Sequence, residues 1–85
     1  MAHWVITEEY LDRLRPIARF ETTREEALSM LYETACSHRF TKGLIQQRRE
    51  VFRVDDCTYY VEVLGAMSTY RLRYCLAERV WSTDT

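Results

Sequence analysis

The feature that most constrains the fold is the alternation of apolar and polar residues in the second half of the chain. From about residue 57 to residue 76, apolar side chains recur at every second position. This is the period of a β-strand with one buried face. Residues 65–68 interrupt the pattern with a Gly-Ala-Met-Ser segment that suits a turn. The sequence therefore predicts a β-hairpin with one apolar face and one polar face.

One register satisfies both faces of this hairpin. If residues 65–68 form a four-residue loop, Leu64 faces Thr69, and every later pair follows from that one. The apolar face then carries the pairs Val63 with Tyr70, Val61 with Leu72, Tyr59 with Tyr74, and Cys57 with Leu76. The polar face carries the pairs Glu62 with Arg71, Tyr60 with Arg73, and Thr58 with Cys75. We expect a charge pair and an arginine–aromatic contact on the polar face.

A third strand is expected to join the hairpin by a turn at residues 55–56. In that register Phe52 lies beside Tyr59 on the apolar face, and Arg49 lies beside Glu62 on the polar face. The turn lacks the glycine that a tight turn prefers, and Glu50 would point at the core. A longer turn, or a strand that starts near Val51, would relieve both problems. Whether residues 44–49 are helical or extended stays open.

The polar face of this predicted sheet gathers arginines around one tyrosine and one glutamate. Such a face suits a solvated surface, a protein interface or a phosphate-binding surface. Its residues are the main candidates for partner binding: Arg49, Arg53, Tyr60, Glu62, Arg71 and Arg73.

The first half of the chain predicts two helices. Thr7 and the two glutamates after it resemble a helix N-cap and an acidic first turn, and Tyr10 and Leu14 follow at helical spacing. Pro16 predicts a break or kink near Arg15.

The second helix is predicted over residues 23–37. Thr23 with Glu26 has capping-box spacing, as does Thr22 with Glu25. The apolar residues that repeat at i, i+3, i+4 and i+7 are Leu28, Leu31, Tyr32 and Ala35.

These elements predict a single compact α+β domain over residues 1–85. Two N-terminal helices pack on one face of a three-stranded antiparallel β-sheet, with room for a short N-terminal strand around Trp4 and Val5. A chain of 85 residues provides one hydrophobic core. Over residues 7–81 this order of elements resembles that of the RelE/ParE toxins, which implies an RNA-directed module as one alternative for the function.

The chain is poor in groups that carry catalysis. It has two histidines, His3 and His38, and two isolated glycines, which exclude a glycine-rich phosphate loop. We therefore expect no enzyme activity, no cofactor and no metal. The three cysteines form no CxxC pair, which predicts free thiols in a reducing compartment. No apolar run approaches the ~18 residues that span a bilayer, and we expect a cytoplasmic protein.

Recognition by a surface is the function class that remains. Tyrosine, tryptophan and arginine are enriched at protein interfaces, whereas a net charge of −1 lacks the basic balance of nucleic-acid-binding domains. We expect a small protein-binding module, of the inhibitor or adaptor type found among phage and mobile-element accessory proteins, that acts on a larger host complex. Trp4 and Trp81 are further candidate anchors. RNA binding is the alternative, and an open sheet edge would also allow a homodimer.

Overall fold

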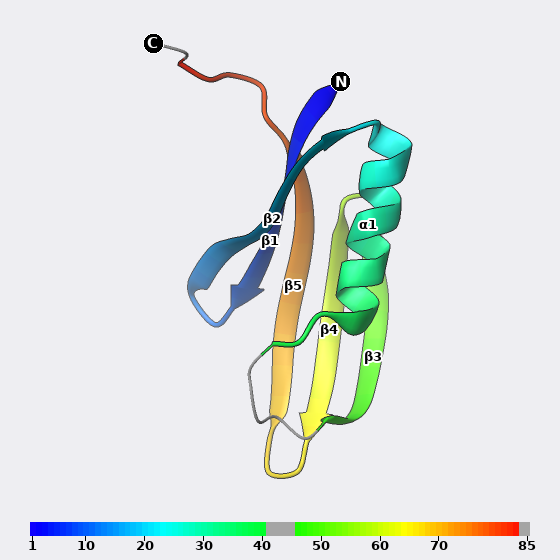
Figure 1. The fold of residues 1–85 in the computed structure, drawn as a ribbon. Coiled ribbons are helices and arrows are strands. Elements are labelled where there is room, and N and C mark those ends of the chain that lie inside the picture. The colour runs from blue at the N-terminus through cyan, green and yellow to red at the C-terminus, as the bar shows by residue number, and fades with distance from the viewer. Residues whose placement is uncertain (41–45, 84–85) are drawn as a thin grey trace.

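The computed structural model describes residues 1–40 and 46–83 and contains a five-stranded antiparallel sheet with one helix on one of its faces (Figure 1). In chain order the elements are β1 (Ala2–Tyr10), β2 (Arg13–Thr22), α1 (Arg24–Ser37), β3 (Gln46–Asp55), β4 (Thr58–Gly65) and β5 (Thr69–Glu78). The strand order in the sheet is β2-β1-β5-β4-β3. The first strand therefore pairs with the last, and this pairing joins an N-terminal hairpin to a three-stranded C-terminal sheet.

The predicted fold of two helices on a three-stranded sheet is wrong. The segment expected to form the first helix is the hairpin of β1 and β2. Within β1, Trp4, Ile6 and Glu8 are all buried while their neighbours are more exposed, so the true period of this segment is two. The β-branched residues between Trp4 and Glu8 also favour a strand. With a hairpin in this place, the order of elements no longer resembles that of the RelE/ParE toxins.

Two residues that suggested a helix with a break have other roles in this hairpin. Leu11 lies in the turn between the strands and has a φ of 57°, in the left-handed region. Pro16 lies in β2, at the edge of the sheet, next to an irregularity in the register. A proline is tolerated there because an edge strand leaves part of its backbone unpaired.

The prediction of a helix over residues 23–37 is confirmed. Thr23 is the N-cap, and its hydroxyl accepts a hydrogen bond from the backbone N–H of Glu26 at 3.3 Å. The face that packs on the sheet is turned slightly from the predicted one. Ala27, Leu31 and Ala35 are fully buried, whereas Tyr32 is 52% exposed.

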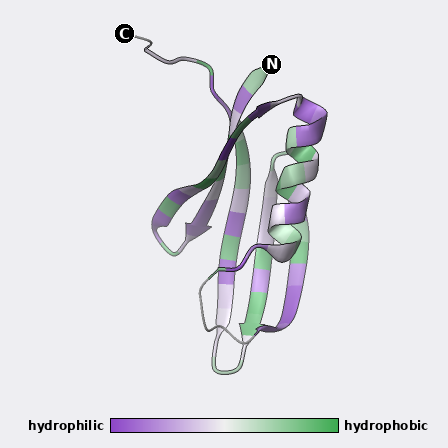
Figure 2. Cartoon of the chain, in the orientation of Figure 1, coloured by the Kyte–Doolittle hydropathy of each residue, from purple (hydrophilic) through white to green (hydrophobic). Residues whose placement is uncertain are grey.

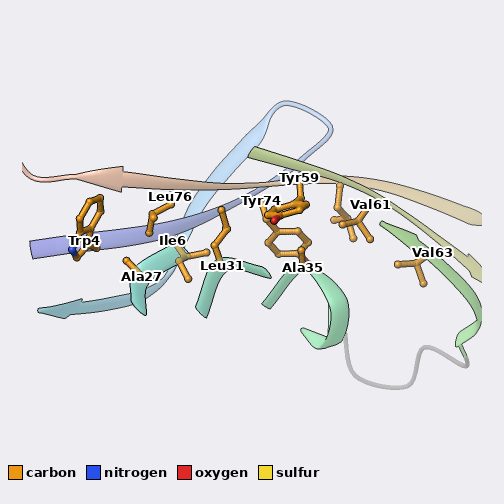
Figure 3. Close-up of a cluster of buried hydrophobic side chains, with 11 residues drawn as sticks. Trp4, Ile6, Ala27, Leu31, Ala35, Tyr59, Val61, Val63, Tyr74 and Leu76 are labelled. Carbon is orange, nitrogen blue, oxygen red and sulfur yellow. The ribbon is translucent and has the colours of Figure 1, made fainter. Parts of the chain in front are cut away.

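The hydrophobic core lies between α1 and the sheet (Figure 3). Figure 2 shows hydrophobic and hydrophilic residues alternating along the strands, as expected for a sheet with one covered face. The buried side chains of the core are Trp4, Ile6, Ala27, Leu31, Ala35, Tyr59, Val61, Val63, Leu72, Tyr74 and Leu76. The predicted apolar face of β4 and β5 is thus part of the core.

The register of the hairpin of β4 and β5 is confirmed from Thr58 to Leu64, but the predicted register of β3 is wrong by one residue. Phe52 faces Tyr60, not Tyr59, and Glu50 faces Glu62. At the turn, the Asp55 carboxylate accepts a hydrogen bond from the N–H of Cys57 at 2.8 Å, beside an irregularity in the strand pairing. A shift of one residue moves every side chain of a strand to the other face. Residues 46–49 are extended, and residues 44–45 lie outside the described part.

A carboxylate is buried in this core. The side chain of Glu8 is 1% exposed, and its Oε1 atom lies 2.9 Å from Nε and 2.8 Å from Nη2 of Arg15. Its Oε2 atom accepts a hydrogen bond from the Tyr74 hydroxyl at 2.7 Å and lies 3.5 Å from Nε2 of His38. A buried charge is tolerated when it is paired and hydrogen-bonded. These partners therefore allow a glutamate at a core position, where the sequence had suggested a solvated helix start.

Replacement of Leu31 by alanine should destabilise the protein strongly, because the side chain is 0% exposed beneath α1. We expect a loss of about 2–5 kcal/mol in the free energy of unfolding. Urea denaturation followed by circular dichroism measures it. Ser29→Ala, on the exposed side of the same helix, should change stability by less than about 0.5 kcal/mol. Equal stability of the two variants would show that α1 packs through another face.

Replacement of Tyr74 by phenylalanine should have an effect that depends on pH. Burial raises the pKa of the Tyr74 hydroxyl, and the hydrogen bond to Glu8 raises it further, while Arg49 lowers it. At neutral pH the lost donor to a buried carboxylate should cost about 1–3 kcal/mol of stability.

The sign of the pH dependence follows from that raised pKa. The unfolded chain releases the tyrosine proton near pH ~10, while the folded protein retains it. The contribution of Tyr74 to stability is thus complete below pH ~10 and is lost as the pH rises further. In urea denaturation from neutral to alkaline pH, the difference in stability between wild type and Tyr74→Phe should shrink above that point. A constant difference would contradict the assignment.

Candidate functional site

The side of the sheet opposite α1 is the candidate site, and we call it the open face. No other described element packs on it, as Figure 1 shows. The registers place on it the alternate residues of each strand, including Leu14 and Arg19 of β2, Val5, Thr7 and Glu9 of β1, Arg71, Arg73, Cys75 and Ala77 of β5, Thr58, Tyr60 and Glu62 of β4, and Arg48, Glu50 and Phe52 of β3.

One row of side chains crosses all five strands of the open face. In sheet order it consists of Leu14, Glu9, Arg73, Tyr60 and Phe52, each paired with the next. The rings of Phe52 and Tyr60 are stacked, with centroids 6.0 Å apart and planes at 30°. Nη1 of Arg73 lies 3.5 Å from Oε1 of Glu9. The row therefore combines a charge pair with a stacked aromatic pair, and Phe52 is 47% exposed.

A second row carries more charge pairs. Glu62 accepts a hydrogen bond from the Tyr60 hydroxyl at 2.8 Å and lies 3.6 Å from Nε of Arg71. The hydrogen bond to Glu62 raises the pKa of the Tyr60 hydroxyl. Glu50 faces Glu62 across the strands and has its own partner, Arg48, at 3.4 Å. Each glutamate of this row is thus paired with an arginine.

Short side chains occupy the part of the open face beside the first row. Thr7, Cys75 and Thr58 form the neighbouring row across three strands, and Arg19, Val5 and Ala77 form the one after it. On β1, β5 and β4 these side chains are short and uncharged, so they rise less above the sheet than the tyrosine and arginines do. The open face therefore has a low strip of short, uncharged side chains on these three strands, with Arg19 at its β2 end, bordered by a charged and aromatic ridge.

The structure brings together four of the residues that the sequence marked for partner binding. Tyr60, Glu62, Arg71 and Arg73 all lie on the open face, as the confirmed register of β4 and β5 requires. Arg49 and Arg53 do not lie with them, because the shifted register of β3 places both on the helix side of the sheet.

The two tryptophans lie in different environments. Trp4 is 6% exposed in the core, and its indole N–H donates a hydrogen bond to the backbone oxygen of Thr22 at 3.0 Å. Trp81 follows the end of β5 and is 78% exposed. Of the two, only Trp81 is accessible to a partner.

Arg49 has a structural role at the end of α1. Its Nε donates to the backbone oxygen of Ala35 at 2.9 Å, and its Nη1 donates to that of His38 at 2.9 Å. These carbonyls lie at the helix C-terminus, where the last turn contains no basic residue. A cation is favourable there because it meets free carbonyl groups and the negative end of the helix dipole. His38 is the C-cap of α1, where its backbone N–H donates to the oxygen of Thr34, and its ring lies beside Glu8.

Among the residues of the open face that sequence reasoning missed are Glu9 and Phe52, both in the first row. The signal for Phe52 was present, since the predicted register pointed Glu50 into the core, and a shift of one residue removes that conflict. The signal for Glu9 was the alternation of Trp4, Ile6 and Glu8. Tyr10 and Leu14 follow in the same segment at helical spacing, and they led to the prediction of a helix instead of a strand.

Other kinds of site find little support in the described residues. Within residues 1–40 and 46–83, no group of three histidine, cysteine or acidic side chains is placed to hold a metal ion. Cys36, Cys57 and Cys75 are free thiols. In the same ranges, no helix has both the length and the apolar character needed to cross a membrane.

The charge pairs of the open face should contribute little to stability. The side chains of Arg71 and Glu62 are 68% and 33% exposed, so solvent screens their attraction. We expect a double-mutant cycle with Arg71→Gln and Glu62→Gln to give a coupling of ~0–1 kcal/mol in urea denaturation. A coupling of several kcal/mol would mean that this pair holds the sheet together.

Comparison with known proteins adds no relative: no protein-family model, no curated protein and no solved structure matches the chain. The geometry of the open face is therefore the basis of the function proposed below.

Proposed function

We propose that the protein is a non-enzymatic binding module that recognises another protein through its open face. The observation that supports this most directly is the row in which Glu9 pairs with Arg73 and Tyr60 stacks on Phe52. Arginine and aromatic side chains are enriched where protein interfaces are buried. Here they form a continuous ridge across the sheet on the face that α1 leaves uncovered.

The charge of the open face favours a protein over a nucleic acid as the partner. Arg48, Arg71 and Arg73 are each within 3.6 Å of a glutamate oxygen. A phosphate backbone would have to compete with these carboxylates for each guanidinium, and the carboxylates would repel it. A protein surface of mixed charge can instead align acidic groups with the arginines and basic groups with the glutamates.

The shape of the open face also indicates which partner surface would fit it. The low strip of Val5, Thr7, Thr58, Cys75 and Ala77 allows close approach of a raised apolar element, such as a helix or a loop. The ridge with Tyr60 and Arg73 then flanks that element. We propose a partner that presents an apolar ridge bordered by both acidic and basic side chains.

The biological setting belongs to the same proposal. A small domain that binds through one face suits an inhibitor or adaptor acting on a larger complex, as in phage and mobile-element accessory proteins. Three free thiols fit a reducing compartment such as the cytoplasm.

The experiment compares two pairs of substitutions that remove the same residue types from opposite sides of the sheet. The first variant carries Tyr60→Ala and Arg73→Ala on the open face. The second carries Tyr32→Ala and Arg24→Ala on exposed positions of α1. Wild type and both variants are immobilised and exposed to host lysate with and without nuclease treatment, and any captured protein is purified and its Kd measured by calorimetry. Circular dichroism verifies that both variants fold.

We expect the open-face variant to bind the purified partner at least about tenfold more weakly than wild type, because interface arginines and tyrosines are frequent hot spots. The α1 variant should bind like wild type. Equal binding by both variants would contradict the proposal. So would capture that is lost after nuclease treatment, which would assign the face to RNA, or wild type that captures only itself, which would assign it to a homodimer.

A further inference from the structure

A cavity on the helix side of the sheet lies apart from the open face. It has a volume of about 460 Å³ and is lined by Glu8, Tyr10, Arg13, Arg15, Phe40 and Tyr70. It lies at the turn end of the β1–β2 hairpin, which in Figure 1 extends away from α1. Its volume is in the range of cavities that hold small molecules.

Three aromatic rings form one wall of this cavity. Tyr10 comes from β1, Phe40 from the segment after α1, and Tyr70 from β5. The ring of Phe40 lies 4.6 Å from that of Tyr10 and 5.4 Å from that of Tyr70, and the two tyrosine rings are 6.0 Å apart. All three residues are only half-buried. Their remaining exposed ring surface suits contact with a planar, apolar group.

Buried Glu8 fixes an arginine at the edge of the same cavity. Its carboxylate accepts hydrogen bonds from Arg15 and Tyr74, and its Oε2 atom also lies 3.5 Å from Nε2 of His38. Glu8 is therefore buried and already paired within the protein. Its effect is to hold the Arg15 guanidinium, whose side chain is still 58% exposed. An arginine restrained in this way loses little conformational entropy when it binds an anion.

Arg13 adds a second cation to the lining. It is exposed, and within residues 1–40 and 46–83 no acidic side chain lies within ion-pair distance of it. Two arginines and one carboxylate give the cavity lining a formal charge of +1. This charge favours a ligand with an anionic group and opposes an aromatic cation.

We propose that the cavity binds a small aromatic oxyanion, in which a planar ring carries a phosphate or carboxylate group. The oxyanion binds Arg15 and Arg13, and the ring packs against Tyr10, Phe40 and Tyr70. Arg13 can donate two parallel hydrogen bonds to either anion, whereas Nε and Nη2 of Arg15 already contact Glu8, so Arg15 contributes through its remaining N–H groups. This site lies on the other side of the sheet from the protein-binding face and does not depend on the function proposed for that face.

The test uses NMR titration of the isotope-labelled protein with phenyl phosphate, benzoate and inorganic phosphate. We expect phenyl phosphate or benzoate to cause saturable shifts of the Glu8, Tyr10 and Tyr70 amides, with a Kd on the order of 1 mM for so small a probe. Comparison of the two aromatic probes shows which oxyanion is preferred. Inorganic phosphate should bind at least about tenfold more weakly, because it cannot use the aromatic wall.

The variants separate the cavity from general surface charge. Arg13→Gln and Arg15→Gln should each weaken binding of the better probe about fivefold or more. Arg19→Gln is the matched control, since Arg19 lies on the same strand but on the open face, and it should leave the Kd unchanged. Arg13 has no part in the Glu8 cluster, so Arg13→Gln remains informative even if Arg15→Gln fails to fold.

Three results would overturn the assignment. One is the absence of saturable shifts with either aromatic probe at about ten times the expected Kd. Another is equal affinity for inorganic phosphate and the aromatic probes, which would indicate charge attraction without a ring site. The third is an equal loss of affinity in Arg13→Gln and Arg19→Gln.

Discussion

The pairing of β1 with β5 is the constraint on which the rest of the structure depends. It joins the two ends of the chain, since Trp4 faces Glu78 and Tyr10 faces Leu72. Closing so long a loop costs conformational entropy that local contacts do not repay. The cost is offset by burying Ile6, Leu76 and Tyr74 under α1. Without this pairing, the N-terminal hairpin would have no partner and the sheet would be reduced to three strands.

The same pairing explains why one strand contributes to two different surfaces. Alternate residues of β1 point to opposite sides, so Glu8 enters the polar cluster beside the cavity while Glu9 enters the ridge of the open face. On β5 the neighbours Arg73 and Tyr74 divide in the same way. Two adjacent glutamates that look equivalent in the sequence therefore have different environments. Glu8 is buried and accepts hydrogen bonds from Arg15 and Tyr74, and Glu9 is part of an accessible ion pair.

The sequence allowed one half of the fold to be predicted and concealed the other. In β4 and β5 the alternation is uninterrupted and the loop length is defined, so a single register satisfied both faces, and it placed four of the candidate partner-binding residues on the open face. In β1 and β2 the polar residue Glu8 occupies a core position and Pro16 lies inside a strand, and both weaken the period-two signal. The segment forms a hairpin because β1 also pairs with β5, a long-range interaction that no local sequence pattern encodes.

The error in β3 had a different cause and a larger effect on the site. Glu50 pointing toward the core was a sign that the register was shifted, and the irregularity in the strand pairing between Arg53 and Asp55 accounts for the shift. A shift of one position places Phe52 on the open face and Arg49 and Arg53 on the helix side of the sheet. The face predicted to be rich in arginine is therefore balanced in charge. That balance is the physical reason to favour a protein partner over RNA.

The two edges of the sheet are less suited to recognition than its open face. A sheet also binds partners by adding a strand at an edge, which requires a regular and unhindered backbone. At one edge, β2 contains Pro16 beside an irregular register. At the other, β3 ends in an irregularity next to Asp55 and carries Arg48 and Arg53. Proline, bulges and charged side chains all hinder the addition of a strand. The proposed surface for a partner is therefore the central ridge around Tyr60 and Arg73, where side chains rather than backbone would make the contacts.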